Sequence, residues 1–212
     1  MSVNFLTRCC VNVLPSLGLA PARSAARSGG WILLKKTTRY IERNHSKRMW
    51  FLHELRLYVK KYGSKNIVYF DESGFAANVY RTHGWAERGV KIHGDITGNH
   101  HRGRTNLIMA QRGKEWLAPM LFEGGCHTEL VNDWVRDFLL PELTAPSLII
   151  MDNARFHNKE NISNLLAAKG HKLMPLPPYS PDFNPIEQSF AIIKKRRIFN
   201  NQSLQQILMG NS

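Results

Sequence analysis

The chain has 212 residues, of which 43% are hydrophobic and 21% are charged, a composition typical of globular proteins rather than disordered or collagen-like ones. No apolar stretch approaches the roughly 20 residues that a membrane-spanning helix needs, so the sequence excludes a transmembrane protein. Lysine and arginine number 29 against 16 aspartates and glutamates, and the net charge of +13 favours a polyanionic partner, most commonly nucleic acid.

The start of the chain differs in composition from the rest. Residues 1–41 contain no acidic residue and are rich in Ser, Ala, Gly and Arg. We assign residues 1–34 to a basic leader, disordered or unrelated to the domain that follows, with an organellar transit peptide as the alternative. Cys9, Cys10 and Cys126 make neither a disulfide framework nor a zinc motif, so we expect a reducing, cytosolic setting.

From residue 35 onward the hydrophobic pattern predicts alternating helices and strands. Apolar residues three and four positions apart predict a first helix over residues 43–62, ended by Gly63. Short apolar runs predict strands at residues 67–70, 105–110, 116–122, 148–151 and 173–176. Helical spacing predicts further helices at residues 131–139, at 162–166, and from about residue 185.

This order predicts the sheet topology. The first three strands follow one another without a helix and can pair antiparallel, whereas the later strands are separated by helices and need parallel crossovers. We therefore predict one α/β domain over residues 35–205, with a mixed sheet of three antiparallel and then parallel strands, flanked by helices.

Two acidic residues follow directly after predicted buried strands. Asp71 follows Ile67–Phe70, and Asp152 follows Leu148–Met151. We expect both at carboxyl ends of strands, where the ligand sites of open α/β sheets lie. If the strands are neighbours, the carboxylates converge and repel each other unless a cation lies between them, and a hard ion such as Mg²⁺ prefers oxygen ligands. Taken singly, each aspartate is equally well explained as a turn or cap residue.

A third acid lies 34 residues beyond Asp152. Glu187 stands in the sequence Asn184-Pro185-Ile186-Glu187, which by itself is better explained as a helix cap, with Asn184 as the N-cap. The interval between Asp152 and Glu187 holds one helix, one strand and a turn, which returns the chain to the same edge of the sheet. Together the three acids form a candidate divalent-cation site.

Three sequence blocks carry a family resemblance. They are VYFDESGF (Val68–Phe75), IMDNARFH (Ile150–His157) and LPPYSPDFNPIE (Leu176–Glu187). In their order, their spacing and the specific proline-rich block, residues 35–200 resemble the DDE domain of IS630/Tc1/mariner transposases.

The resemblance implies an RNase H-like fold and a metal-dependent reaction on DNA. It implies that Asp71, Asp152 and Glu187 are catalytic and hold two divalent ions, Mg²⁺ or Mn²⁺. The reaction would cleave phosphodiesters at transposon ends in double-stranded DNA and transfer the freed 3′ ends to a TA-containing target. A homodimer and a bacterial, cytoplasmic location on the nucleoid are the accompanying expectations, with no membrane partner.

Further site residues are expected beside these acids. Asn153 could orient Asp152 or contact phosphate. Asn184 is expected to support the acids without itself binding the metal. His157 could donate a hydrogen bond or carry a proton, or be an ordinary residue at a helix start. Strand alternation turns Glu72 to the other face, so we do not expect it to be a ligand. We expect DNA contacts from six basic residues: Arg102, Arg104, Lys194, Lys195, Arg196 and Arg197. A plain hairpin tip explains the first two equally well, and a solvated helix face is the alternative for the other four.

The sequence also departs from the family pattern. Relatives carry helix-turn-helix modules before the catalytic domain, which do not fit into residues 1–41, and Phe190 stands where many relatives have Trp. We therefore expect a truncated copy or half of a two-frame element. A non-catalytic, DNA-binding remnant that associates with full-length transposase is the alternative. An unrelated RNase H-like nuclease acting on RNA hybrids or junctions is a third hypothesis, which the proline-rich block disfavours.

Overall fold

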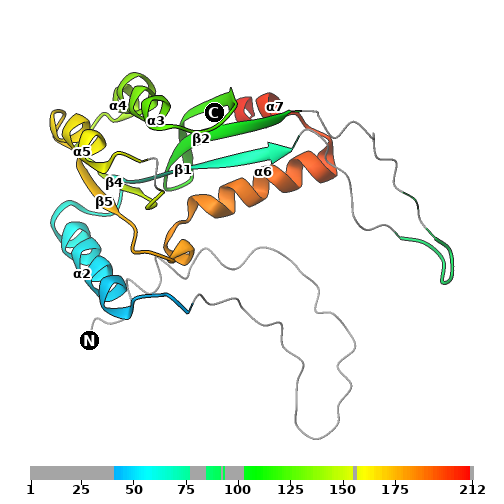
Figure 1. The fold of residues 1–212 in the computed structure, drawn as a ribbon, viewed down its shortest axis with the longest axis horizontal. Coiled ribbons are helices and arrows are strands. Elements are labelled where there is room, and N and C mark those ends of the chain that lie inside the picture. The colour runs from blue at the N-terminus through cyan, green and yellow to red at the C-terminus, as the bar shows by residue number, and fades with distance from the viewer. Residues whose placement is uncertain (1–40, 77–84, 92, 94–102, 155–156, 211–212) are drawn as a thin grey trace, which may run out of the picture.

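The computed structural model describes residues 41–76, 85–91, 93, 103–154 and 157–210 (Figure 1). The assigned leader, residues 1–34, and the expected DNA contact Arg102 lie outside these described residues. Every helix within them is too short or too polar to cross a lipid bilayer.

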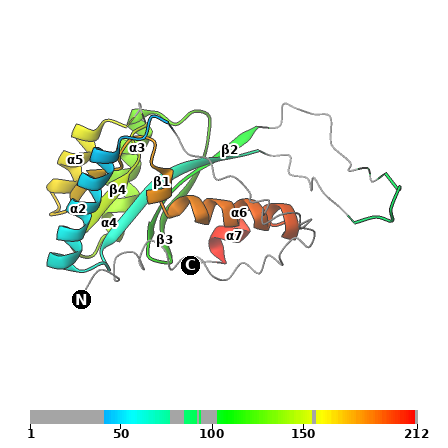
Figure 2. The same cartoon turned by 90° about the horizontal axis from the view of Figure 1, so that it is seen from below.

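A five-stranded mixed sheet forms the centre of the fold (Figure 2). Its strands lie in the order β3-β2-β1-β4-β5. The strands are β1 (Ile67–Ala76), β2 (Arg104–Arg112), β3 (Glu115–Glu123), β4 (Leu148–Met151) and β5 (Lys172–Pro175). β2 pairs antiparallel with both β1 and β3, whereas β4 pairs parallel with both β1 and β5. The predicted topology of three antiparallel and then parallel strands is confirmed.

Helices cover both faces of this sheet. They are α2 (His45–Tyr62), α3 (Thr128–Trp134), the π-helical η1 (Val135–Leu139), α4 (Leu140–Glu142), α5 (Lys159–Ala167), the 3₁₀ turn η2 (Pro181–Phe183), α6 (Ile186–Asn200) and α7 (Leu204–Met209). The predicted helices are confirmed, and α7 is an additional one. Its capping box, in which Ser203 and Gln206 bond each other's backbone, was the sequence signal for it.

Alternate residues of β4 show how the two layers pack. Ile149 and Met151 join the core beneath α3, η1 and α5, whereas Leu148 and Ile150 pack against α2 on the opposite face. α6 and α7 cover that opposite face over β1 and β2, where Phe190 lies edge-on to Phe75. Because both faces of β4 are covered, its sequence is one continuous apolar run.

β1 is longer than the sequence predicted. The expected strand ended at Phe70, but β1 continues to Ala76, so Asp71 lies within the strand, opposite Met109 of β2, instead of following it. The parallel pairing with β4 covers only Ile67–Tyr69. Beyond Tyr69 the antiparallel ladder with β2 holds β1 extended, and this long-range pairing needs no apolar run in β1 itself.

Candidate active site

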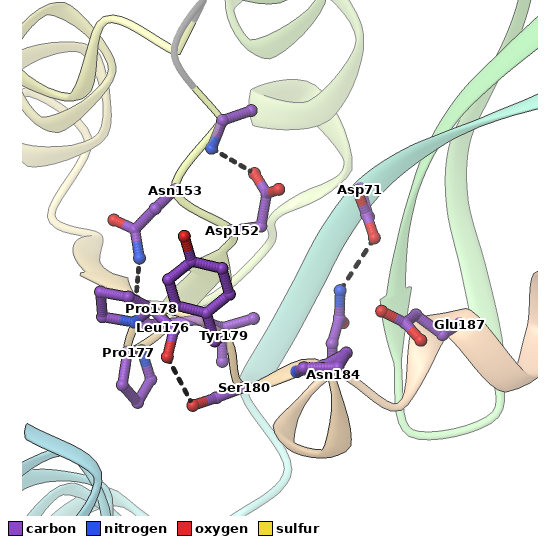
Figure 3. Close-up of a pocket in the computed structure, with 12 residues that line it drawn as sticks. Asp71, Asp152, Asn153, Leu176, Pro177, Pro178, Tyr179, Ser180, Asn184 and Glu187 are labelled. Carbon is purple, nitrogen blue, oxygen red and sulfur yellow. Dashed lines mark hydrogen bonds between the residues drawn. The ribbon is translucent and has the colours of Figure 1, made fainter. Parts of the chain in front are cut away.

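The register of the two central strands brings the first two acids together. Ile67–Tyr69 pair with Leu148–Ile150, and this register, continued by two residues, sets Asp71 level with Asp152. Asp71 follows the strand alternation to the face that α6 covers, and the first turn of α6 supplies Glu187. The three acids line one pocket of about 500 Å³ (Figure 3).

The proline-rich block forms another wall of this pocket (Figure 3). Its lining residues are Leu176, Pro177, Pro178, Tyr179, Ser180, Pro181 and Asn184. Leu176 N donates to the carbonyl of Met151, so this wall starts beside the end of β4. The most specific part of the sequence resemblance therefore surrounds the acids directly.

Asp71 is held from two sides. Its Oδ2 accepts a 2.9 Å hydrogen bond from Asn184 Nδ2, and its Oδ1 accepts one of 2.8 Å from the backbone N–H of Glu72. Burial and the neighbouring charges of Glu72, Asp152 and Glu187 raise the pKa of Asp71 to about 7. Burial and the neighbouring acids thus disfavour the charged form of Asp71, and a bound cation would favour it again.

The structure overturns the capping interpretation of Asn184. The N-cap of α6 is Pro185, and no side chain caps this helix. The Asn184 amide donates a hydrogen bond to Asp71, as expected of a residue that supports the acids. As an N-cap, Asn184 would accept a hydrogen bond through Oδ1 from a backbone N–H of the helix, whereas in the structure its Nδ2 donates to a carboxylate of β1.

Asp152 is held by its own loop and by a buried histidine. Its Oδ1 accepts a 3.0 Å hydrogen bond from Ala154 N and lies 3.1 Å from His157 Nδ1. Burial by itself would raise the pKa of Asp152, but these hydrogen bonds and the charges of His157 and Lys159 lower it below its ordinary value. His157 therefore supports Asp152 and is more than a residue at a helix start.

Glu72 is a site residue that the sequence interpretation missed. It points away from Asp71, as strand alternation predicts, and on that other face its Oε2 lies 3.4 Å from His157 Nε2. Burial would lower the pKa of His157, but Asp152 and Glu72 raise it to about 9. The strand alternation was the only signal for Glu72, and the partner that it meets there comes from the loop before α5.

Glu187 completes the acidic set. Burial raises the pKa of Glu187, the charge of Lys194 opposes this, and Asp152 and Asp182 add to the rise. Among the described residues, no three His, Cys, Asp or Glu side chains lie close enough together to hold one metal ion. Asp71, Asp152 and Glu187 nevertheless line a single pocket as carboxylates, and their mutual repulsion and hard oxygen atoms fit a divalent ion such as Mg²⁺ or Mn²⁺.

Asn153 connects the end of β4 to the proline-rich wall. Its Nδ2 donates to the carbonyl of Leu176, and its Oδ1 accepts from Lys159 Nζ. These bonds use both ends of the amide, so in this structure Asn153 fixes the pocket wall. Lys159 is a second residue that the sequence interpretation did not include.

Several of the expected DNA-contacting residues gather where β1 ends. Arg197 Nη1 donates a 2.9 Å hydrogen bond to the carbonyl of Ala76, and Lys194 Nζ lies 5.5 Å from the ring centre of Phe75. The Arg104 guanidinium lies directly over Gly74. On the same helix, Lys195 is exposed and Arg196 is half-buried.

Comparisons with known proteins agree with this arrangement. The model of the DDE superfamily endonuclease family matches residues 66–207. Among curated proteins, no sequence matches the chain.

The fold is similar to that of the Mos1 transposase. The matches include its paired-end complex with left transposon end (17% identity, TM-score 0.61, covering 78% of this chain and 54% of that one). They also include the mariner Mos1 paired-end complex with Mg (18% identity, TM-score 0.60, covering 84% of this chain and 57% of that one). A third match is the Mos1 catalytic domain (16% identity, TM-score 0.50, covering 84% of this chain and 82% of that one). The chain thus spans about half the length of the transposase chains in the paired-end complexes. It has the expected RNase H-like fold, and it belongs to the DDE superfamily endonucleases.

Proposed function

We propose that residues 35–205 are the catalytic domain of an IS630/Tc1/mariner-type transposase, which cleaves DNA phosphodiesters at transposon ends and transfers the 3′ ends to target DNA. The observation that carries this proposal is the convergence of Asp71, Asp152 and Glu187 from three separate elements on one pocket. The family match supports the same chemistry.

Asp71, Asp152 and Glu187 would hold two divalent ions, Mg²⁺ or Mn²⁺. When bound, such ions activate the attacking water or 3′-hydroxyl and stabilise the leaving oxygen. Mos1 paired-end complexes with Mg and with Mn are among the similar structures, which supports this choice of ions.

The chain's own contribution would be to fix the carboxylates before the substrate arrives. Asn184 and the Glu72 N–H hold the two oxygens of Asp71, while Ala154 N and His157 hold Oδ1 of Asp152. Groups held in this way lose less freedom when the reacting atoms are brought together, which lowers the barrier. His157 is itself held by Glu72.

Double-stranded DNA is the proposed partner. The net charge of +13 and the positions of Arg104, Lys194 and Arg197 near the end of β1 support phosphate binding there. Lys195, Arg196 and Arg102 are proposed as further contacts. We also propose a TA-containing target, a homodimer that joins two ends, and action on the nucleoid in a bacterial cytoplasm.

A joining assay tests this function. The purified chain is incubated with a pre-nicked end duplex and a supercoiled, TA-rich plasmid, with Mg²⁺ or Mn²⁺. We expect metal-dependent nicking or joining that Asp152→Asn abolishes and that Asp133→Asn, at an exposed position of α3, leaves intact. If Asp152→Asn matches the wild type while folding and DNA binding are normal, the chain is a DNA-binding remnant instead.

A further inference from the structure

α2 lies outside the residues that match the family model, yet it contacts the pocket wall. Arg48, in the first turn of α2, is 9% exposed. Its guanidinium donates two hydrogen bonds to the carboxylate of Asp182 in η2. Nη1 donates to Oδ1 at 3.0 Å and Nη2 donates to Oδ2 at 2.6 Å. This paired geometry fixes direction as well as distance.

The next residue of η2 is held by the same helix. The guanidinium carbon of Arg48 lies 3.8 Å from the ring centre of Phe183, and Phe51 stacks on that ring with centroids 5.5 Å apart. Arg43 adds an ion pair to Asp182 at 3.7 Å. Arg48 therefore contacts two consecutive residues of a turn that is only three residues long.

This turn leads directly to the support of Asp71. Asn184 follows Phe183, its backbone N–H donates to the carbonyl of Pro181 at 2.9 Å, and its side chain donates to Asp71. The backbone N–H of Glu187 in turn reaches the Asn184 carbonyl at 3.4 Å. A contact path thus runs from Arg48 through η2 and the Asn184 amide to Asp71.

We propose that Arg48 is a positioning residue for the acidic pocket: by holding Asp182 and Phe183 it sets the Asn184 amide that orients Asp71. This assignment rests on the proposed function, because Arg48 would act by raising the affinity of the pocket for divalent ions. A single 3₁₀ turn has few internal hydrogen bonds to hold its shape. Without Arg48, Asn184 takes up a wider range of orientations, and Asp71 is less fixed.

The test compares Arg48→Gln, Asn184→Ala and the double variant, with Arg136→Gln as the control. Arg136 pairs with Asp133 and Asp137 on the helical segment of the other face, so the control also removes a salt-bridged arginine. The first measurement is the NMR signal of the Asn184 side-chain amide in metal-free protein. The second is the Mn²⁺ concentration for half-maximal nicking of plasmid DNA.

We expect Arg48→Gln to shift the Asn184 amide signals and to raise the half-maximal Mn²⁺ concentration about 10-fold, as loss of an outer-shell support does. The double variant should need no more Mn²⁺ than Asn184→Ala, because both changes act through one contact. The control should change neither measurement.

Two results would overturn the assignment. One is an unchanged Asn184 amide signal in Arg48→Gln, and the other is a double variant whose effects multiply. If Arg48→Gln does not fold, Arg48→Lys and the isosteric Asp182→Asn take its place. If the wild type nicks no DNA with any ion, the proposed function fails, while the amide signal still tests Arg48.

Discussion

The side-chain amide of Asn184 donates a 2.9 Å hydrogen bond to Oδ2 of Asp71, and so connects two residues that are 113 positions apart. The bond crosses from the start of α6 to the middle of β1. The side chain that the sequence offered as the N-cap of α6 makes this bond, and no side chain caps that helix.

Asn184→Ala should weaken the pocket's affinity for divalent ions. Without the amide, Oδ2 of Asp71 loses its donor and the carboxylate can rotate, so we expect about a 10-fold higher Mn²⁺ concentration for half-maximal DNA nicking. Asn164→Ala, at an exposed position of α5, is the control. Equal Mn²⁺ dependence in both variants would show that the bond has no part in metal binding.

The ion pair of Asp182 should make stability depend on pH in the acid range. Partial burial would raise the pKa of Asp182, but the hydrogen bonds from Arg48 and the charges of Arg48 and Arg43 hold it below its ordinary value. Glu187 is the acid that interacts with Asp182. A lowered pKa stabilises the fold above the unfolded value of about 4, and this contribution is lost as pH falls through the folded value.

Urea unfolding of wild type and Asp182→Asn checks this sign. The wild type should be more stable at pH 7, and the difference in the free energy of unfolding should shrink as the pH falls below about 4. A difference that stays constant from pH 7 to pH 3 would mean that the charge of Asp182 contributes nothing.

α7 should contribute substantially to the stability of the domain. Ile207 is 1% exposed and packs in one cluster with Leu107 and Met109 of β2. Ile207→Ala should lower the free energy of unfolding by about 2–5 kcal/mol, whereas Met209→Ala, at a position that is 79% exposed, should change it by less than about 0.5 kcal/mol. Equal urea midpoints for the two variants would contradict the packing of α7.

Gly74 should control DNA binding through Arg104. A Cβ at residue 74 would overlap the Arg104 guanidinium, so Gly74→Ala must displace that side chain. If Arg104 contacts a phosphate, both Gly74→Ala and Arg104→Ala should reduce the salt dependence of DNA binding by about one charge. Fluorescence anisotropy at several salt concentrations measures this slope.

The matched control for this series is Arg112→Ala, at the other end of β2, where Arg112 pairs with Glu115. It should leave the salt slope unchanged. A wild-type slope for Arg104→Ala would exclude Arg104 from the DNA interface.

Local patterns predicted most of the sheet and its helices, because burial repeats with a fixed period. The run Leu148–Met151 indicated a strand covered on both faces, and Asp152 lies just beyond its end as expected. The extension of β1 through Asp71 had no such signal, since Asp71–Gly74 is polar and is held extended by β2.

Tertiary pairings were the part that the sequence could not supply. Arg48 and Asp182 are 134 residues apart, and nothing in either neighbourhood identifies the partner. Asn184 had a plausible local role as a cap, and only the fold shows that its amide donates to Asp71. Glu72 likewise gains its role from His157, a residue of the loop before α5.

Binding of Mn²⁺ to the intact chain, followed by the EPR signal of the free ion, tests most directly whether the three acids act as one divalent-cation site. The wild type and Asp133→Asn should both bind Mn²⁺, whereas Asp71→Asn, Asp152→Asn and Glu187→Gln should each weaken binding strongly, because each removes an anionic ligand from the same pocket. Mn²⁺ binding that is identical in the wild type and the three pocket variants would contradict a shared metal site.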